Sequence, residues 1–400
     1  MNVENFREAT VPSRVLFIRQ HMGPVGEGTS ARGWEQVGRL AAEGHDVTLV
    51  TGRAIAPDEA PRGVRVRSLA TSYEQEMGFL QRKLAFIAFA VKALAVVLRQ
   101  RYDVVFASST PLTVFIPAMA AKVVRPSTRL VLEVRDLWPA LPIAVGALTN
   151  PLERGLARQL ESISYRMADQ VIALSPGMAT EIRRVSGKES VVISNGSSRS
   201  AMRVEPSEAV RLRADLDLPP GAKMVLYAGS IGTVNDPAYL AALVRTTTTI
   251  DPSVYFVIVG SGPGHDALRS QLAGIPVVRM VARVPRSEVV RYFSLADLSL
   301  VTFVREPLME TNSANKFFDS LAAGCPMAVN YGGWHAELLA ESGAGLRLSR
   351  DPAEAAGSVA RVLGEPHTLA GMATAAIELA EQFEWAVLYP PWRRALLGVA

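Results

Sequence analysis

Short apolar, β-branched runs alternate with longer segments of helical period along nearly the whole chain, and this alternation constrains the fold most. Six runs in the first half have the length and composition of buried strands. They are VLFIR (15–19), VTLVT (47–51), VVFAS (104–108), LVLEV (130–134), QVIAL (170–174) and VVIS (191–194). Strands that are apolar throughout and separated by helices belong to a parallel sheet covered on both faces. The first half is therefore predicted to be a doubly wound α/β domain.

The same pattern restarts after a polar segment, SNGSSRSAMRVEPSEA (194–209), which has the composition of a linker. Six further strands are predicted beyond it, again with helices between them. They are MVLYAGS (224–230), VYFVIVG (254–260), VVRMVA (277–282), LSLVTF (298–303), MAVNY (327–331) and AGLRL (344–348). A second doubly wound domain is the simplest interpretation.

The length agrees with this division, because 400 residues exceed what one hydrophobic core usually organises. The predicted domains are residues 1–198 and 199–384, facing each other across a cleft. Residues 385–400 are predicted to form a last helix, broken at the Pro390–Pro391 pair, that crosses back to the first domain.

Composition excludes several classes of protein. One cysteine, Cys325, cannot form an internal disulfide, and the five histidines lack metal-ligand spacing, so no protein-bound metal is expected. The polar segment 1–14 lacks the apolar core of a signal peptide, which favours the cytoplasm. Residues 1–200 hold 25 basic and 18 acidic side chains, whereas 201–400 hold 17 and 20. A basic first half suits an anionic partner, but without interleaved aromatic residues nucleic acid is not expected.

One apolar segment, Leu84 to Leu98, is short for a membrane span and contains Lys92. About 20 apolar residues are needed to cross a bilayer. Basic residues flank the segment on both sides: Arg82, Lys83, Arg99 and Arg101. Two interpretations remain open. The segment is either a core helix with solvated ends or, over 82–101, a helix that lies against an anionic membrane.

The loop after the first predicted strand, HMGPVGEGTSARGWE, leads into a helix whose expected N-cap is Thr29 or Ser30. Bare amides at such a helix start attract a phosphate or another acceptor oxygen. The run from Gly26 through Glu27 and Gly28 also fits G-x-G-x-x-A, the dinucleotide fingerprint. That fingerprint starts directly after its strand, however, and no acid ends the second strand here, so nicotinamide binding is disfavoured.

Charged residues follow the fourth predicted strand in the sequence Glu133-Val-Arg135-Asp136-Leu-Trp138-Pro. Charges at the end of a buried strand cost desolvation energy unless a partner or a ligand offsets it. The segment is therefore either part of a site or an internal Arg135–Asp136 pair that stabilises the turn.

Two glycine-rich loops follow neighbouring predicted strands of the second half. Gly229, Gly232 and Asn235 lie in the first loop, and Gly260 and Gly262 lie in the second. Each loop alone is consistent with a tight strand-to-helix turn. Together, at adjacent strand ends, they indicate a polar ligand such as a phosphate.

The segment 306–326 contains the most specific pattern. Asn312 or Ser313 is expected to cap a helix, with Lys316 in its first turn and Asp319 one turn further. A lysine near a helix N-terminus opposes the helix dipole unless an anion is bound there. Lys316 and the helix amides are thus predicted to hold a diphosphate, and Asp319 to accept hydrogen bonds from ribose hydroxyls. The alternative is a solvated amphipathic face.

Taken together, EVRDLWP, ALSPGM, the NG after VVIS, YAGSIG, VGSGP and NSANKFFDSLAAGCP resemble the retaining GT-B glycosyltransferases of family 4. The chain looks most similar to the bacterial branch typified by L-fucosamine transferases of surface-polysaccharide synthesis. The resemblance extends from about Val15 to the last helix. RDLWP and NSANKFFD are its specific markers.

The resemblance implies a hexosyl transfer from a nucleoside diphosphate sugar, with UDP favoured, with retention and without a metal or other cofactor. Asp136, Lys316 and Arg135 are the catalytic candidates. The implied donor contacts are Gly229, Gly232, Asn235, Gly260, Gly262, Arg283, Thr311, Asn312, Ser313, Asn315 and Asp319. Contacts from the first domain would come from Gly26, Glu27, Gly28 and Trp138. A glycan or polyprenyl-diphosphate-linked acceptor would bind the first domain, at the cytoplasmic face of the membrane if 82–101 contacts it.

The chain also departs from the family pattern. Members carry two acids eight residues apart, whereas Thr311 stands eight positions before Asp319, with Glu310 beside it. SIGTVND replaces an Arg and a Lys after YAGS, and Arg135-Asp136 replaces His-Asp. Two alternatives therefore stay open: a non-catalytic nucleotide-sugar-binding subunit, and a GT-B sugar-nucleotide epimerase.

Overall fold

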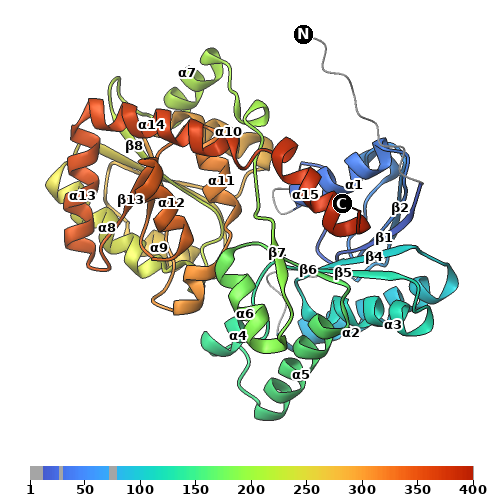
Figure 1. Ribbon diagram of the computed structural model, residues 1–400. Helices are drawn as coiled ribbons and strands as arrows, with labels where there is room; N and C mark the ends of the chain where they lie inside the picture. The colour runs from blue at the N-terminus through green and yellow to red at the C-terminus, as the bar shows by residue number, and fades with distance from the viewer. Residues whose placement is uncertain (1–11, 27–29, 72–78, 400) are drawn as a thin grey trace, which may run out of the picture.

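The structure, a computed structural model, describes residues 12–26, 30–71 and 79–399. Its first domain contains a seven-stranded parallel sheet in the order β3-β2-β1-β4-β5-β6-β7 (Figure 1). The strands are β1 (Arg14–Ile18), β2 (Asp46–Thr51), β3 (Val64–Ser68), β4 (Val104–Ser108), β5 (Arg129–Val134), β6 (Gln170–Ala173) and β7 (Ser190–Val192). All pairs in the sheet are parallel. Six of the seven strands match the predicted runs.

Helices cover both faces of this sheet and bury two apolar clusters against it. One cluster lies under α2, α3, α5 and α6, and the other lies under α1 together with the last helix of the chain. The helices of the first domain are α1 (Ala31–Ala42), α2 (Phe79–Arg99), α3 (Phe115–Val124), α4 (Ala140–Ala144), α5 (Pro151–Met167) and α6 (Pro176–Ser186).

The second domain repeats the plan with six parallel strands in the order β10-β9-β8-β11-β12-β13. The strands are β8 (Lys223–Ala228), β9 (Val254–Val259), β10 (Val278–Val281), β11 (Leu298–Val301), β12 (Met327–Val329) and β13 (Gly345–Arg347). The helices are α7 (Pro206–Asp215), α8 (Pro237–Ile250), α9 (His265–Gln271), α10 (Arg286–Leu295), α11 (Asn315–Ala322), α12 (Trp334–Ser342), α13 (Pro352–Gly364) and α14 (Pro366–Glu381). The prediction of two doubly wound α/β domains is confirmed.

Short 3₁₀ helices occur in the connections: η2 (Pro57–Glu59), η3 (Leu112–Val114), η4 (Ser200–Met202), η5 (Thr233–Asn235) and η6 (Pro307–Thr311). The chain leaves the first sheet after β7 and reaches α7 through a largely irregular segment, coloured light green in Figure 1.

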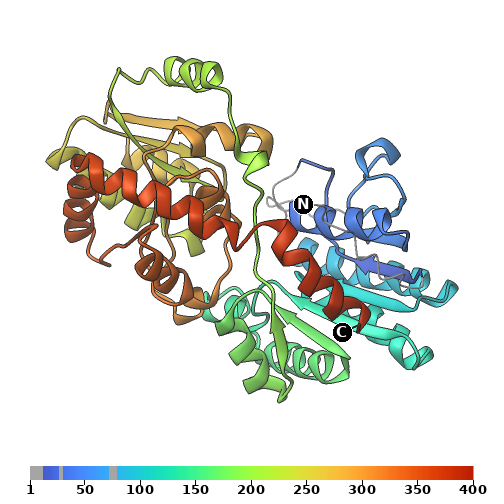
Figure 2. The same ribbon diagram turned by 45° about the horizontal axis from the view of Figure 1, so that its top comes forward.

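The last helix, α15 (Trp385–Leu397), returns to the first domain, as Figure 2 shows in red. The ring of Trp392 packs edge-on against Phe106 of β4, with 5.5 Å between centroids. Arg129 of β5 donates hydrogen bonds to the last carbonyl groups of this helix. The predicted break at the two prolines is wrong, because α15 continues through Pro390 and Pro391 as one helix.

Two stretches of chain cross between the domains, and they are bonded to each other. The amide of Ser197 donates to the carbonyl oxygen of Phe383, and the amide of Arg199 donates to Glu384. A Cβ atom on Gly196 would overlap that same Phe383 carbonyl oxygen, so only glycine allows this close approach.

Helix α2 contains the predicted apolar segment and has two different faces. Phe89, Ala93 and Val97 are buried in the core of the first domain. The opposite face exposes large apolar side chains: Leu84, Ile87, Val91 and Leu98. Within the described part of the chain, no helix is both long and apolar enough to span a membrane.

Candidate functional site

Each sheet reverses its strand order at one point, between β1 and β4 in the first domain and between β8 and β11 in the second. Ligands of doubly wound sheets bind beyond the carboxyl ends of the strands at such a point. A ligand is therefore expected near the carboxyl ends of the strands in both domains. In the second domain these ends are the loops after β8 and β9 and the start of α11, and in the first domain they are the loops after β1, β4 and β5. Contacts between η6 and α6 bring the two sets of loops together.

Lys316 lies in the first turn of α11 and points to the end of β8. Its Nζ atom is buried and has no hydrogen-bond partner. The amine lies 4.3 Å from the centroid of the Tyr227 ring, and a Cβ atom on Gly229 would lie 2.6 Å from Nζ. Burial lowers the pKa of Lys316 to about 8. A buried ammonium group held over an aromatic face at a strand end is suited to bind an anion.

The two glycine-rich loops pack against each other. A Cβ atom on Gly260 would overlap the carbonyl oxygen of Gly229, and one on Gly262 would overlap that of Ile231. The amide of Gly229 already donates to Val259, and that of Gly260 donates to Val281. Close packing of backbone on backbone is thus sufficient to explain glycine at 260 and 262.

Two further predicted donor contacts lie near these loops. Asn235 is buried, and its carbonyl oxygen accepts a hydrogen bond of 2.6 Å from Thr302. The amide of Asn235 donates to the carbonyl oxygen of Gly232, so the two residues lie in one turn. Arg283 follows β10 with an exposed side chain.

Thr311, Asn312 and Ser313 lie at the contact between the domains. The carbonyl oxygen of Thr311 accepts a hydrogen bond from Ser175, the residue that caps α6. Asn195 of the linker donates its side-chain amide to the carbonyl oxygen of Ser313 at 2.5 Å. Thr311 and Ser313 therefore join the second domain to the first, whereas Asn312, between them, bonds to Met309, Ala314 and Trp334 of its own domain.

The predicted cap of α11 by Asn312 or Ser313 is wrong, because the N-cap is Ala314 and makes no side-chain bond. Asn312 uses its side chain to close a turn onto the amide of Ala314, and the Ser313 hydroxyl accepts from the amide of Asn195. A partner from the other domain thus replaces the local cap. Asn315 begins the helix.

Asp319, the predicted ribose contact, is buried and paired with Arg286, the first residue of α10. The same guanidinium group lies 3.3 Å from the hydroxyl of Ser197 in the linker. This ion pair fixes the carboxylate beside the path that connects the domains. Only the Oδ1 atom of Asp319 takes part in the pair.

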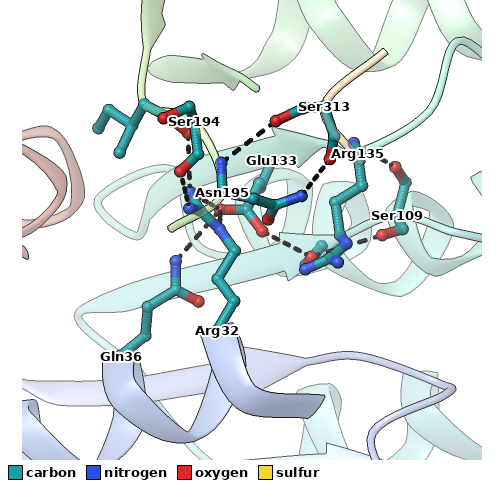
Figure 3. Close-up of polar contacts among 10 residues, drawn as sticks. Arg32, Gln36, Ser109, Glu133, Arg135, Ser194, Asn195 and Ser313 are labelled. Atoms are coloured by element: carbon teal, nitrogen blue, oxygen red, sulfur yellow. Dashed lines mark hydrogen bonds and ion pairs between the residues drawn. The ribbon is translucent and has the colours of Figure 1, made fainter. Parts of the chain in front are cut away.

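A buried ion pair occupies the first domain where β5 ends (Figure 3). Glu133 Oε2 accepts hydrogen bonds from Arg32 at 2.7 and 2.9 Å and from Gln36 at 3.2 Å, and Oε1 accepts from Ser108. Burial alone would raise the pKa of Glu133, but Arg32 and Arg135 lower it to about 2. Arg32 also donates to the carbonyl oxygens of residues 193 and 194. The pair thus joins α1, β5 and the start of the linker.

Arg135 and Asp136 follow this pair. The backbone amide of Arg135 donates to the hydroxyl of Ser109 at 2.9 Å (Figure 3). The Nη1 atom of Arg135 is buried without a hydrogen-bond partner. Asp136 is accessible to water, yet surrounding protein raises its pKa, an effect that Arg135 and Thr110 reduce. Trp138 is half-buried against the apolar core of the first domain.

The predicted loop contacts of the first domain are described only in part. Gly26 has a φ of +96° and open space around it, whereas Glu27, Gly28 and Thr29 lie outside the described residues. Ser30 is the N-cap of α1, as predicted, but its hydroxyl accepts from the amide of Gly23 instead of a helix amide.

Sequence reasoning did not name Arg32, Asn195, Tyr227 or Arg286 as site residues, although Asn195 and Tyr227 lie in the NG and YAGSIG motifs. Three of them pair with residues far along the chain, so no local spacing signals them. Tyr227 lies inside a predicted strand, where an aromatic side chain is expected to be core. Among the described residues, no group of three or more His, Cys, Asp or Glu side chains is placed to hold a metal ion.

Two family models match the chain, one in each domain. The model described as "Glycosyl transferase 4-like domain" matches residues 27–196, and the one described as "Glycosyl transferases group 1" matches residues 222–365.

The curated relatives of this chain are named as glycosyltransferases. A D-inositol 3-phosphate glycosyltransferase from Streptosporangium roseum is 26% identical over 93% of this chain and 90% of the relative. D-inositol 3-phosphate glycosyltransferase 2 from Catenulispora acidiphila is 26% identical over 54% of this chain. The match spans about half of the Catenulispora relative's own length, 53%.

Solved structures share the arrangement of domains. Anabaena HepE in complex with UDP and glucose superposes with a TM-score of 0.72 at 16% identity, covering 97% of this chain and 100% of that one. Sucrose-phosphate synthase from Thermosynechococcus elongatus gives a TM-score of 0.76 at 18% identity, covering 96% and 98%. At such identities the likeness establishes the fold. Since family models match both domains in order, the chain belongs to the GT-B glycosyltransferases that join a glycosyl transferase 4-like domain to a group 1 domain.

Proposed function

We propose that the protein transfers a hexose from a nucleoside diphosphate sugar, with retention of anomeric configuration and without a metal, to a glycan or lipid-linked acceptor in surface-polysaccharide synthesis. The buried ammonium group of Lys316, which lies beside Gly229 and has no hydrogen-bond partner, carries this proposal. A diphosphate bound there would neutralise the lysine at a helix N-terminus. UDP is the favoured nucleotide, since HepE, of the same fold, was solved with UDP and with UDP-glucose.

The donor would lie on the second domain. Lys316 and the amides that open α11 would contact the diphosphate, and Asp319 would accept from ribose hydroxyls with Arg286 holding its carboxylate in place. Glu310 lies against the loop of Gly332 and Gly333, because Cβ atoms there would meet its side chain and backbone. In the proposed function Glu310, next to Thr311, would contact the sugar in place of the first of the family's two acids.

Chemically, negative charge develops on the departing diphosphate while the anomeric carbon becomes oxocarbenium-like. Fixed positive groups that meet this developing charge lower the barrier. Lys316 and the helix amides would supply that field. The acceptor hydroxyl would lose its proton to a leaving phosphate oxygen on the same face of the sugar, so no separate base is required. Asp136 would orient the acceptor or the sugar from the first domain.

A lipid-linked acceptor fits the exposed face of α2. Leu84, Ile87 and Val91 are each more than half exposed and follow one another at helical spacing. A cavity of about 470 Å³ lies beside the end of this helix and is lined in part by Arg67 and Arg99. We propose that this face contacts an anionic membrane, with the two arginines near lipid headgroups.

Vesicle flotation tests the membrane contact. Replacing Ile87 and Val91 by Asn should abolish co-flotation with vesicles that contain phosphatidylglycerol. Val210→Asn on α7, also exposed, is the matched control and should float like the unmodified protein. Equal flotation of all variants would refute the proposed contact.

Thermal unfolding with UDP, GDP, TDP, ADP and NAD(P) tests the donor site, with and without magnesium. A ligand at 100 times its Kd adds about 2.7 kcal/mol to the free energy of unfolding, a visible rise in Tm. Stabilisation by one nucleoside diphosphate without magnesium supports the transferase. Nucleotide binding without turnover of any donor and acceptor would favour a non-catalytic binding subunit. Conversion of the donor without an acceptor would favour an epimerase. Stabilisation by NAD(P) alone would contradict the proposal.

A further inference from the structure

Tyr227 is a buried residue of β8 whose ring and hydroxyl contact two different parts of the proposed donor site. The ring faces the ammonium group of Lys316, with 4.3 Å between Nζ and the ring centroid. The hydroxyl donates to the carbonyl oxygen of Ser230 at 2.7 Å, in the glycine-rich loop that follows the strand. Only 2% of Tyr227 is exposed, so the ring is shielded from water. Tyr227 therefore joins the lysine of α11 to the loop after β8.

The ammonium group of Lys316 depends on this ring for its stability as a cation. Its Nζ atom is buried and has no hydrogen-bond partner among the described residues. Burial is what lowers the pKa of Lys316, and no ionisable side chain in the described part of the chain counteracts the effect. The acid one turn further along α11, Asp319, is already paired with Arg286. Because the face of an aromatic ring attracts a desolvated cation, the Tyr227 ring is the group that stabilises the charged amine.

The loop after β8 offers little positive charge of its own to an anion. The amides of Gly229 and Ile231 already donate to carbonyl oxygens at the end of β9 and in the loop after it. The sequence of 230–236, SIGTVND, contains neither Arg nor Lys. Burial raises the pKa of Tyr227, so its hydroxyl is neutral at neutral pH and places no negative charge beside the lysine. A diphosphate at this strand end would therefore depend on Lys316, and the placement of Lys316 depends on the ring.

We propose that Tyr227 is a positioning residue of the donor site, whose ring holds the charged amine of Lys316 in place and whose hydroxyl fixes the loop after β8. This inference rests on the proposed function in one respect, namely that a diphosphate binds at Lys316. A cation that is already held in place meets the developing negative charge without further reorganisation. The aromatic ring is thus required at position 227, and an apolar side chain of similar size does not replace it.

The first test uses the ligand-free protein, so it does not depend on nucleotide binding. The chain has six lysines, and NMR of protein containing ε-¹³C-labelled lysine follows the titration of each, with Lys316→Arg to assign the signal of Lys316. We expect a midpoint of about pH 8 in the unmodified protein and one about a pH unit lower in Tyr227→Leu, because the charged amine loses the ring. Tyr227→Phe keeps the ring and should keep the midpoint. An unchanged midpoint in a folded Tyr227→Leu protein would overturn the proposal.

Tyr239 on α8 provides the matched control. It is also buried in the second domain, and its hydroxyl likewise donates to a carbonyl oxygen, that of Ser349, at 2.7 Å. Tyr239→Leu therefore removes a ring and a hydrogen bond of the same kind without touching Lys316, and the midpoint of Lys316 should stay at about pH 8. Equal shifts in Tyr227→Leu and Tyr239→Leu would show a general loosening of the domain and would also overturn the proposal.

Calorimetric titration of UDP from about pH 6.5 to 9 then tests the connection to the donor. For Tyr227→Leu the affinity should begin to fall about one pH unit lower than for the unmodified protein. Tyr227→Phe should keep the onset but bind about fivefold more weakly at every pH, because Ser230 loses its hydrogen bond.

A role of the ring in packing alone would weaken UDP binding by Tyr227→Leu equally at every pH, and that result would contradict the proposal. Failure of the proposed function is seen separately, as a lack of UDP binding by the unmodified protein. The NMR midpoints would still show whether Tyr227 holds the charge on Lys316.

Discussion

At the scale of single residues, Glu133 and Arg32 form the ion pair on which the first domain depends. Their side chains are 0% and 2% exposed, and 101 residues separate them in sequence. Replacing Glu133 by Gln should lower the free energy of unfolding by about 3–5 kcal/mol, because Arg32 would stay buried without its counter-charge. Urea denaturation followed by circular dichroism measures the change.

Glu189→Gln is the matched control, since Glu189 pairs with Arg183 on the surface. An exposed pair contributes little, so this variant should unfold within about 0.5 kcal/mol of the unmodified protein. Equal losses in the two variants would contradict a special role for the buried pair.

Lys316 predicts a pH dependence of nucleotide binding. Because burial lowers its pKa to about 8, the amine is charged below that pH and neutral above it. UDP affinity should be constant between pH 7 and about 8, and should then fall by about tenfold per pH unit as the free protein loses the proton. Calorimetric titration across this range measures the trend. Lys316→Arg should keep its affinity at high pH, and an equal decline in both proteins would refute the assignment.

The free energy of unfolding should change with pH in the opposite direction to UDP affinity. The folded chain binds the Lys316 proton less tightly than the unfolded chain does, so deprotonation favours folding. This contribution of Lys316 to the free energy of unfolding should therefore increase as pH rises from about 8 toward the ordinary pKa of lysine.

At the scale of elements, the glycine-rich loops after β8 and β9 depend on each other. Gly260→Ala should destabilise the second domain by several kcal/mol, because its φ is +154° and the new Cβ would overlap the Gly229 carbonyl oxygen. Gly357→Ala in α13 has open space around it and should stabilise by up to about 1 kcal/mol. Thermal unfolding compares the two, and a neutral Gly260→Ala would contradict the packing.

Most elements could be predicted from sequence because their periodicity is strong. The strand β3 was missed because Val64 and Val66 alternate with Arg65 and Arg67, as befits an edge strand paired only with β2. The α11 cap was wrong for another reason. The Ser313 hydroxyl accepts a hydrogen bond from the amide of Asn195, outside the second domain, instead of capping the helix. Local spacing cannot show such a distant partner.

The residues of the candidate site also differ in whether local sequence could reveal them. Lys316 could be recognised because its conflict with the helix dipole is visible within a few residues of sequence. The pairs Arg32–Glu133 and Arg286–Asp319 join residues of different elements, so they appear only once the sheets are assembled.

At the scale of the whole molecule, α15 makes the first domain depend on the end of the chain. Trp392 is 1% exposed and packs on Phe106 of the central strand β4. Trp392→Ala should cost about 3–5 kcal/mol and destabilise the first sheet selectively. Hydrogen exchange should show loss of protection in β4 and β5. Val387→Ala, exposed on the same helix, should leave exchange unchanged, and a loss confined to the second domain would refute this coupling.

The central claim is that Lys316 binds the diphosphate of the donor. Calorimetric titration of UDP at pH 7 into the unmodified protein, Lys316→Ala and Lys316→Arg tests it most directly. We predict clear binding by the unmodified protein, a loss of at least about tenfold for alanine, and partial retention for arginine. Unchanged UDP affinity in a folded Lys316→Ala protein would contradict the claim.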